Sequence, residues 1–150
     1  MNIMIAIADS NNTDFMELIK LLDEDLENTY GELQKSYKKY NVVQNINNVV
    51  IAYNYNTPIG CGGFKEFDKA TVELKRIFVK KECRGQGIAK KIVDELEKLA
   101  KANGYKFAVL ETGVKQLEAI KLYKGKGYGA IKNYGPYEGN ANSICMRKVL

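Results

Sequence analysis

A predicted strand that enters a glycine-bearing turn and then an amphipathic helix constrains this chain more than any other segment. Residues 71–79 are apolar and β-branched enough to predict a strand, and residues 84–87 carry the two glycines of the turn. Apolar residues then recur at helical spacing until Asn103-Gly104, which is typical of a helix end. A short buried strand follows at residues 107–112. A strand, a helix and a second strand in this order predict parallel pairing through a crossover, so we expect a sheet that is parallel at least within residues 71–112.

The other segments extend this unit to a mixed α/β sheet in which strands outnumber helices. Apolar or alternating runs predict strands at residues 3–8, 49–53, 59–64 and 143–149, the middle two as a hairpin. Helical periodicity predicts helices at residues 14–27, 30–40 and 116–126, with Thr13 as the cap of the first. No linker or repeat separates these segments, so we expect a single domain over residues 1–150.

Composition limits the chemistry that the chain can perform. It contains no histidine, which excludes Ser-His or Cys-His relays and histidine-ligated metals. Its three cysteines, Cys61, Cys83 and Cys145, form no zinc pattern and indicate reduced thiols, so we expect a cytoplasmic protein without metal. The N-terminus has no signal-peptide pattern, and no apolar run is long enough to span a membrane. The net charge of +5 favours anionic partners without choosing among them.

The glycine-bearing turn has the features of a diphosphate site. Gly85 and Gly87 allow a tight turn and close approach of a ligand to the backbone, and the first N–H groups of the helix have no helical acceptor. Arg84, Lys90 and Lys91 add positive charge. The turn lacks the pattern of a P-loop, and Lys90 stands where a dinucleotide fingerprint needs a small residue. A turn that only starts a helix remains the alternative.

Three motifs resemble those of the GNAT superfamily of N-acetyltransferases. The acetyl-CoA signature [QR]-x-x-G-x-[GA] reads Arg84-Gly85-Gln86-Gly87-Ile88-Ala89, and residues 73–79 resemble the strand that precedes it in that family. Residues 116–128 resemble its N-x-x-A-x-x-[LF]-Y-x-x-x-G-[FY] segment, with Gln116 in place of asparagine. The resemblance implies an acyl-CoA N-acyltransferase fold: a twisted mixed sheet of six to seven strands flanked by about four helices.

The resemblance also implies acetyl transfer from the co-substrate acetyl-CoA to a primary amine, by direct attack in a ternary complex. Backbone N–H groups of Ile77, Phe78 and Val79 would hold the thioester carbonyl and the pantetheine arm. The diphosphate would lie on the N–H groups of Gln86, Gly87, Ile88 and Ala89, in a turn shaped by Arg84 and Gly85. Gln116 is a candidate contact to pantetheine.

Two residues are the candidate catalytic groups. An alkyl amine has a pKa near 10.4 and arrives protonated, so a base is needed, and the departing thiolate gains from a proton donor. Glu73, on the strand before the signature, is the candidate base, with Glu111 and a water chain as alternatives. Tyr123 matches the family tyrosine near the sulfur of CoA, although its place on an apolar helix face also fits core packing.

The acceptor is the least determined part of the prediction. The acidic run at residues 23–27 and the aromatic and acidic loop at residues 134–138 are candidate walls for an amine, and either is also compatible with a solvated surface. We expect a small-molecule amine or amino acid, no nucleic-acid or membrane partner, and possible homodimers. A non-catalytic acyl-CoA sensor remains the alternative, and nucleic-acid binding is disfavoured because the chain has few arginines.

Overall fold

The computed structural model describes residues 1–31 and 46–150 of the chain. The helix predicted at residues 30–40 lies outside the described residues except for its first two positions. Of these, Tyr30 is the last residue of the preceding helix and Gly31 is its C-terminal cap. No helix in the described residues is long and apolar enough to cross a membrane.

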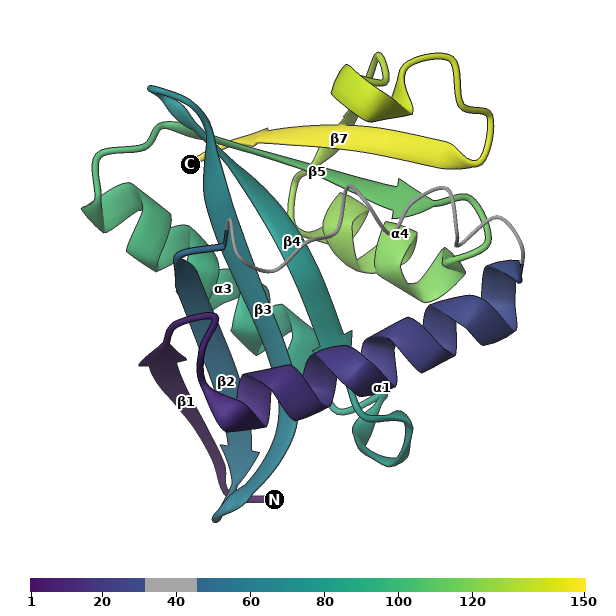
Figure 1. Ribbon diagram of the computed structural model, residues 1–150. Helices are drawn as coiled ribbons and strands as arrows, with labels where there is room; N and C mark the ends of the chain where they lie inside the picture. Colours follow the sequence, from purple (N-terminus) through teal and green to yellow (C-terminus); the bar gives the residue numbers. More distant parts are fainter. Residues whose placement is uncertain (32–45) are drawn as a thin grey trace.

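Seven strands in the described part of the chain form one mixed sheet in the order β1-β2-β3-β4-β5-β7-β6 (Figure 1). The strands are β1 (Ile3–Ala8), β2 (Asn48–Asn54), β3 (Thr57–Asp68), β4 (Thr71–Val79), β5 (Phe107–Gly113), β6 (Gly129–Ile131) and β7 (Ser143–Val149). The helices between them are α1 (Thr13–Tyr30), α3 (Ile88–Ala102) and α4 (Leu117–Gly125), with short 3-10 helices η3 (Lys81–Cys83) and η4 (Gly135–Tyr137). β4 and β5 pair in parallel, as the sequence predicts, and the other neighbouring strands are antiparallel.

β4 and β5 separate partway along their length. Their register runs from Thr71 opposite Phe107 to Glu73 opposite Val109 and then ends. On its other side β4 continues to pair with β3, but two of its residues, Arg76 and Ile77, occupy the space of one there, which is a β-bulge. Arg76 has a φ of 60°, a left-handed conformation that is unusual for arginine. The bulge bends β4 away from β5 and opens the sheet in its middle (Figure 1).

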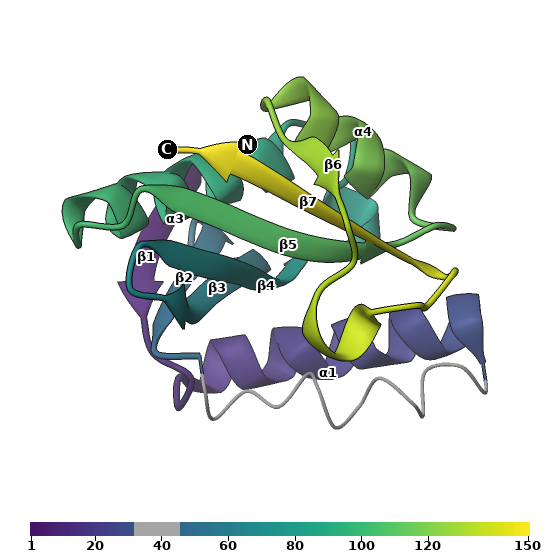
Figure 2. The same cartoon turned by 90° about the horizontal axis from the view of Figure 1, so that it is seen from above.

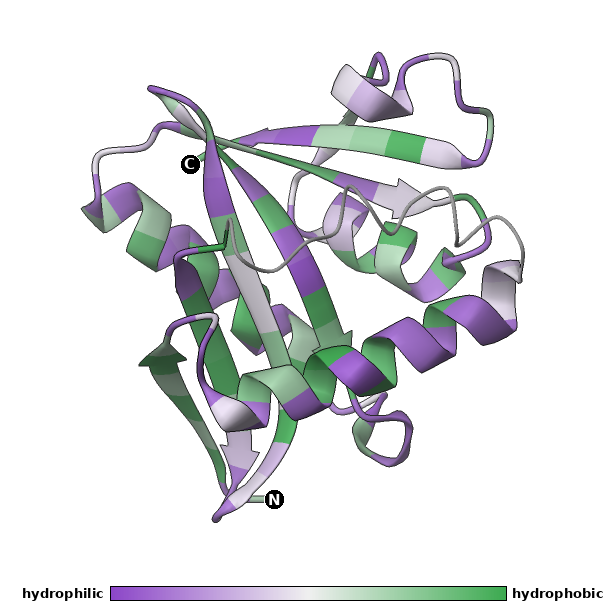
Figure 3. Cartoon of the chain, viewed as in Figure 1, coloured by the Kyte–Doolittle hydropathy of each residue, from purple (hydrophilic) through white to green (hydrophobic). Residues whose placement is uncertain are grey.

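Two helices cover opposite faces of the sheet and bury separate cores (Figure 2). Phe15, Leu18 and Leu22 of α1 pack on one face, where β2, β3 and β4 also contribute. Ile92 and Leu96 of α3 pack on the other face. Each helix places one apolar stripe against the sheet and a polar face outward. Along α1 the hydropathy colouring alternates between hydrophobic and hydrophilic residues, as such a helix requires (Figure 3).

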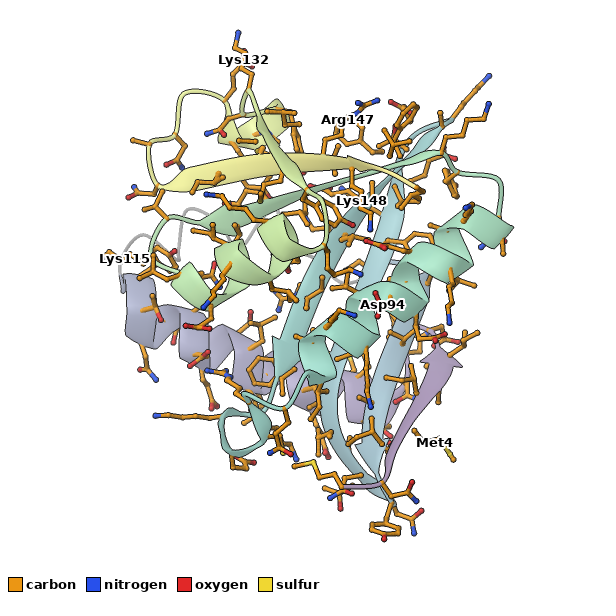
Figure 4. All side chains as sticks on the ribbon, turned by 180° about the vertical axis from the view of Figure 1, so that it is seen from behind. Met4, Asp94, Lys115, Lys132, Arg147 and Lys148 are labelled. Atoms are coloured by element: carbon orange, nitrogen blue, oxygen red, sulfur yellow. The ribbon has the colours of Figure 1, made fainter. Side chains whose placement is uncertain are left out.

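Ion pairs fix the C-terminal end of α4 to the rest of the protein. Lys126, whose side chain is 7% exposed, pairs with Asp94 and Glu97 of α3, and Lys148 of β7 also reaches Glu97. Asp94 lies on the outward side of α3 in the view from behind (Figure 4). This network sets the position of α4 and of the residues that it directs toward the gap between β4 and β5.

One predicted detail of the fold is wrong. Thr13 does not cap the first helix: Asn12 does, because its side-chain oxygen accepts a hydrogen bond from the N–H of Phe15 at 3.1 Å. Both residue types form N-caps, so the sequence alone does not separate them. β3 is also longer than predicted, since it extends from Thr57 to Asp68.

Candidate functional site

A cavity of about 120 Å³ lies where β4 and β5 separate. Its walls are residues 74–77 of β4 and residues 110–113 of β5, with side chains of α1 and α4 and with Asn142. The helix contribution from α1 is Leu22, Leu26 and Tyr30, all near its C-terminal end. The cavity therefore lies beside the bulge, and segments distant in the sequence complete its walls.

The β4 wall exposes backbone that the sheet does not use. Strand pairing with β5 ends at Glu73, so in the described structure the β5-facing edge of β4 beyond that residue has no strand partner. Ile77 lies on this edge and lines the cavity. Backbone groups without a strand partner can hydrogen-bond an extended, amide-containing ligand as a further strand would.

The glycine-bearing turn lies at the end of β4 and starts α3. Gly85 and Gly87 have φ values of 79° and 77°, which favour glycine, and a Cβ added at either position would meet no atom within 4 Å. The first α-helical hydrogen bond runs from the N–H of Lys91 to the carbonyl of Gly87, so the N–H groups of Ile88 and Ala89 have no helical acceptor. This open helix N-terminus, without an acidic residue in its first turn, fits an anion.

Arg84 holds the turn in place through its own side chain. Its Nε donates to the carbonyl oxygen of Val79 at 2.9 Å, and its Nη2 donates to Asp25 of α1 at 3.0 Å. Its guanidinium also lies 5.6 Å from the centre of the Phe78 ring. The signature arginine therefore fastens the turn to β4 and to α1.

The two glutamates predicted as alternative bases have different surroundings. Glu73 is 4% exposed and does not line the cavity. The hydroxyl of Tyr134 donates to its Oε2 at 2.8 Å, and Nζ atoms of Lys65 and Lys75 each lie 3.8 Å from its Oε1. Glu111 lines the cavity, and burial raises its pKa, an effect that a hydrogen bond with Ser143 and the charge of Lys75 partly offset.

Tyr123 and Gln116 form the α4 wall. Tyr123 is 7% exposed, and its ring packs edge-on against that of Tyr128 at 5.8 Å. Burial and the nearby Glu111 raise the pKa of Tyr123, so its hydroxyl stays protonated. The amide oxygen of Gln116 accepts from the N–H of Gly113 at 2.9 Å, which leaves its NH₂ group for another partner.

The predicted cofactor residues fall into two groups. Ile77, Gln116 and Tyr123 line the cavity. Phe78, Val79 and residues 84–89 do not line it and lie along the end of β4 and the start of α3. The two groups follow one path, from the cavity along β4 to the helix N-terminus.

The acidic run of α1 has partners that its sequence does not reveal. Asp23 accepts from Nη2 of Arg76 at 2.6 Å, and Asp25 accepts from Arg84. These two carboxylates are therefore engaged with β4 and the turn. The aromatic loop is likewise engaged, because Tyr134 reaches Glu73.

Sequence reasoning did not select Tyr30, Lys75, Arg76 or Asn142, all of which line the cavity. Tyr30 connects the end of α1 to the segment after β5, where the N–H of Lys115 donates to its hydroxyl at 3.3 Å. Figure 4 shows Lys115 beside the C-terminal end of α1. The available signal was the adjacent pair Lys75-Arg76 inside an apolar strand, since buried charges in a strand interior need a reason.

Comparisons with known proteins agree with this arrangement. The family model described as the acetyltransferase (GNAT) family matches residues 15–128. An IAA acetyltransferase from Azospirillum brasilense is 33% identical over 102 residues, which are 67% of this chain and 67% of that protein. A Klebsiella pneumoniae structure described as an acyl-CoA N-acyltransferase has a TM-score of 0.82 at 26% identity, covering 99% of this chain and 97% of its own. The PaiA N-acetyltransferase of Thermoplasma acidophilum, solved with coenzyme A, has a TM-score of 0.77 at 21% identity, covering 100% of both chains.

Proposed function

The chain belongs to the acetyltransferase (GNAT) family, and from this premise we propose that it acetylates a primary amine of a small molecule or amino acid. It is an acetyl-CoA-dependent acetyltransferase, and the proposal concerns its acceptor, its mechanism and the single domain that carries them. The observation that supports the mechanism most is the cavity between β4 and β5, because it brings a half-buried carboxylate and a buried phenol to the same unpaired strand edge.

Acetyl-CoA fits along the path from the α3 N-terminus to the cavity. The N–H groups of residues 86–89 would take the diphosphate, where the open space at Gly85 and Gly87 admits it. The backbone of Ile77 and its neighbours on β4 would hold the pantetheine arm and the thioester carbonyl. The free NH₂ group of Gln116 is placed at the same cavity and can donate to an acceptor on the pantetheine arm.

Glu111 is the better placed base of the two predicted glutamates. It lines the cavity, whereas Glu73 is held by a tyrosine hydroxyl and two lysines outside the cavity lining. A raised pKa brings the basicity of Glu111 closer to that of the amine. Its carboxylate would take a proton from the ammonium form of the acceptor.

Tyr123 would stabilise the departing sulfur by hydrogen bonding. Because its pKa is raised well above that of a thiol, full transfer of its proton to the thiolate is uphill, and donation of a hydrogen bond is the favoured role. In the overall reaction a nitrogen–carbon bond forms while the carbon–sulfur bond breaks. An ammonium substrate and acetyl-CoA then give the amide, the CoA thiol and one proton.

The experiment that tests this function measures thiol release from acetyl-CoA across a panel of amines and amino acids. Acceptor-dependent release, with the acetylated product identified by mass spectrometry, is the expected result. Tight acetyl-CoA binding without release for every acceptor would instead support the sensor alternative.

A further inference from the structure

One guanidinium nitrogen of Arg76, a residue of the cavity wall, has no hydrogen-bond partner. Among the described residues, Nε of Arg76 is the buried side-chain polar atom left without one. The side chain is 4% exposed, and Arg76 forms part of the cavity wall. A buried N–H donor without an acceptor is costly, so native structures rarely keep one unless a ligand or water satisfies it.

The backbone of Arg76 has an unfavourable conformation. Within the β4 bulge the residue is left-handed, a conformation that residues other than glycine seldom adopt. Asp23 of α1 binds its Nη2 at 2.6 Å, so one end of the guanidinium is fixed while Nε stays unsatisfied. Backbone strain of this kind is commonly kept at ligand-binding sites.

The charges around the cavity match a molecule that carries both signs. Arg76 and its neighbour Lys75 are cationic and lie on the β4 wall, whereas Glu111 is a carboxylate on the β5 wall. The ammonium group of Lys75 lies 3.8 Å from Glu73, and Lys75 contributes a second cationic residue to this wall. The cavity of about 120 Å³ has room for small polar groups such as the carboxylate and amine of an amino acid.

On the basis of the proposed function, we infer that the acceptor is an amine that also carries a carboxylate, such as a free amino acid. Its carboxylate accepts a hydrogen bond from Nε of Arg76, which a small shift of that buried side chain makes accessible from the cavity, and its ammonium group lies beside Glu111. The acetylated nitrogen is that of the same molecule, so the reaction remains N–C bond formation with loss of the CoA thiol. An amine without a carboxylate leaves Nε unsatisfied and faces two cationic side chains on the β4 wall.

The test uses acceptor pairs that differ by the carboxylate alone, with rates compared at equal concentrations of neutral amine because the carboxylate also changes the pKa of the amine. Leucine is compared with 3-methylbutylamine, and phenylalanine with 2-phenylethylamine, with leucinamide as a neutral member of the first series. The measured quantity is the ratio of kcat/KM for the amino acid to kcat/KM for its amine, from thiol release. A charge-assisted hydrogen bond predicts a ratio of about 10 to 100 in favour of the amino acid, most of it in KM.

Variants then assign the preference to this guanidinium. Arg76→Gln is expected to reduce the ratio to near 1. Asp23→Asn leaves the guanidinium in place and removes the negative charge opposite Nη2, while its amide oxygen can still accept from Nη2. It is therefore expected to keep the ratio or raise it, even if Arg76→Gln does not fold. Glu24→Gln removes a neighbouring exposed carboxylate of α1 and is the matched control, with the ratio of the unaltered protein expected.

The outcomes separate this inference from the proposed function. Release with the simple amines at rates equal to or above those of the amino acids overturns the inference and leaves the acetyltransferase function standing. A ratio that Arg76→Gln leaves unchanged in a folded protein, or that Asp23→Asn abolishes, also overturns it. Absence of release with every acceptor overturns the proposed function and the inference with it.

Discussion

Replacement of Glu111 by glutamine tests the mechanism most directly. The substitution keeps the size of the side chain and its hydrogen-bonding oxygen but removes the group that would take a proton from the acceptor. We expect kcat/KM for the amine to fall, while acetyl-CoA binding measured by calorimetry stays within about threefold, because general-base catalysis acts on the chemical step.

The size of the effect follows from the protonation state of the acceptor. An alkyl amine with a pKa near 10.4 is neutral in roughly one molecule in a thousand at pH 7.4. Without a base, Glu111→Gln depends on that fraction, so we expect a loss of about 10²–10³ at this pH. The loss is expected to shrink by about tenfold for each unit by which the pH is raised, because the neutral amine fraction grows by that factor.

In the unaltered enzyme the pH dependence comes from Glu111 and not from the amine. Glu111 must be ionised to accept a proton, and burial raises its pKa, so activity falls as the pH drops through that raised value. The groups that face Glu111 are Lys75 and Glu73 from β4, Ser143 at the start of β7, and Tyr123 from α4. Burial lowers the pKa of Lys75, so this lysine is a neighbouring group whose charge also falls as the pH rises.

The assay is a pH profile of thiol release between about pH 6 and pH 9 with an alkyl amine. Glu73→Gln is the matched control, since it removes a neighbouring buried carboxylate that lies outside the cavity lining. We expect this variant to keep an amide oxygen that accepts from Tyr134 but to lose the charge that pairs with Lys65 and Lys75, and with it some stability, without recovery at high pH. A Glu111→Gln loss that is constant with pH, together with recovery in Glu73→Gln, would show that Glu73 is the base.

Three further substitutions test other parts of the structure. Tyr123→Phe is expected to lower kcat by about 10- to 100-fold with little change in acetyl-CoA affinity, since it removes a hydrogen bond to the leaving sulfur; unchanged turnover would exclude Tyr123 from the reaction. In Gly87→Ala the added methyl group meets no atom, so the conformational cost is that of the left-handed backbone alone, about 1–2 kcal/mol. We expect weaker acetyl-CoA binding by calorimetry, and unaltered affinity would refute this. Asn12→Ala removes the cap of α1 and is expected to lower the free energy of unfolding by about 1 kcal/mol in a urea titration, with Thr13→Ala as a milder control; equal losses would contradict the assignment of the cap.

Sequence patterns predict best the strands and helices in which the spacing of apolar residues is regular from end to end. Strands at residues 3–8, 71–79 and 143–149 have the bounds that the pattern predicts. The α3 helix begins directly after Gly87 and ends at Ala102, with Asn103 as its cap. In these segments local propensity and burial favour the same structure, so a single sequence suffices. The parallel pairing of β4 and β5 was predictable for a related reason, because the intervening helix permits a crossover.

The interior of the site was harder to predict because it depends on a break in the strand period. Alternation along β4 places Glu73 and Lys75 on one face, but the bulge at Arg76 shifts the residues that follow. A glutamate in the strand before the signature was therefore a reasonable candidate by position, and the structure finds Glu111 rather than Glu73 in the cavity wall. No pattern in one sequence locates a bulge, since it is fixed by packing against the neighbouring strand.

The acidic residues of α1 show how the same break joins distant parts of the chain. Asp25 and Arg84 are each more than two-fifths exposed, and an exposed ion pair of this kind contributes little stability, so its main effect is to orient the turn. Arg76 is 4% exposed, and loss of Asp23 would leave a buried cation with fewer partners, which is a larger cost. The bulge that opens the sheet therefore also places a buried guanidinium that Asp23 of α1 must neutralise. An anionic group on the acceptor would give Nε of the same guanidinium the partner that it lacks.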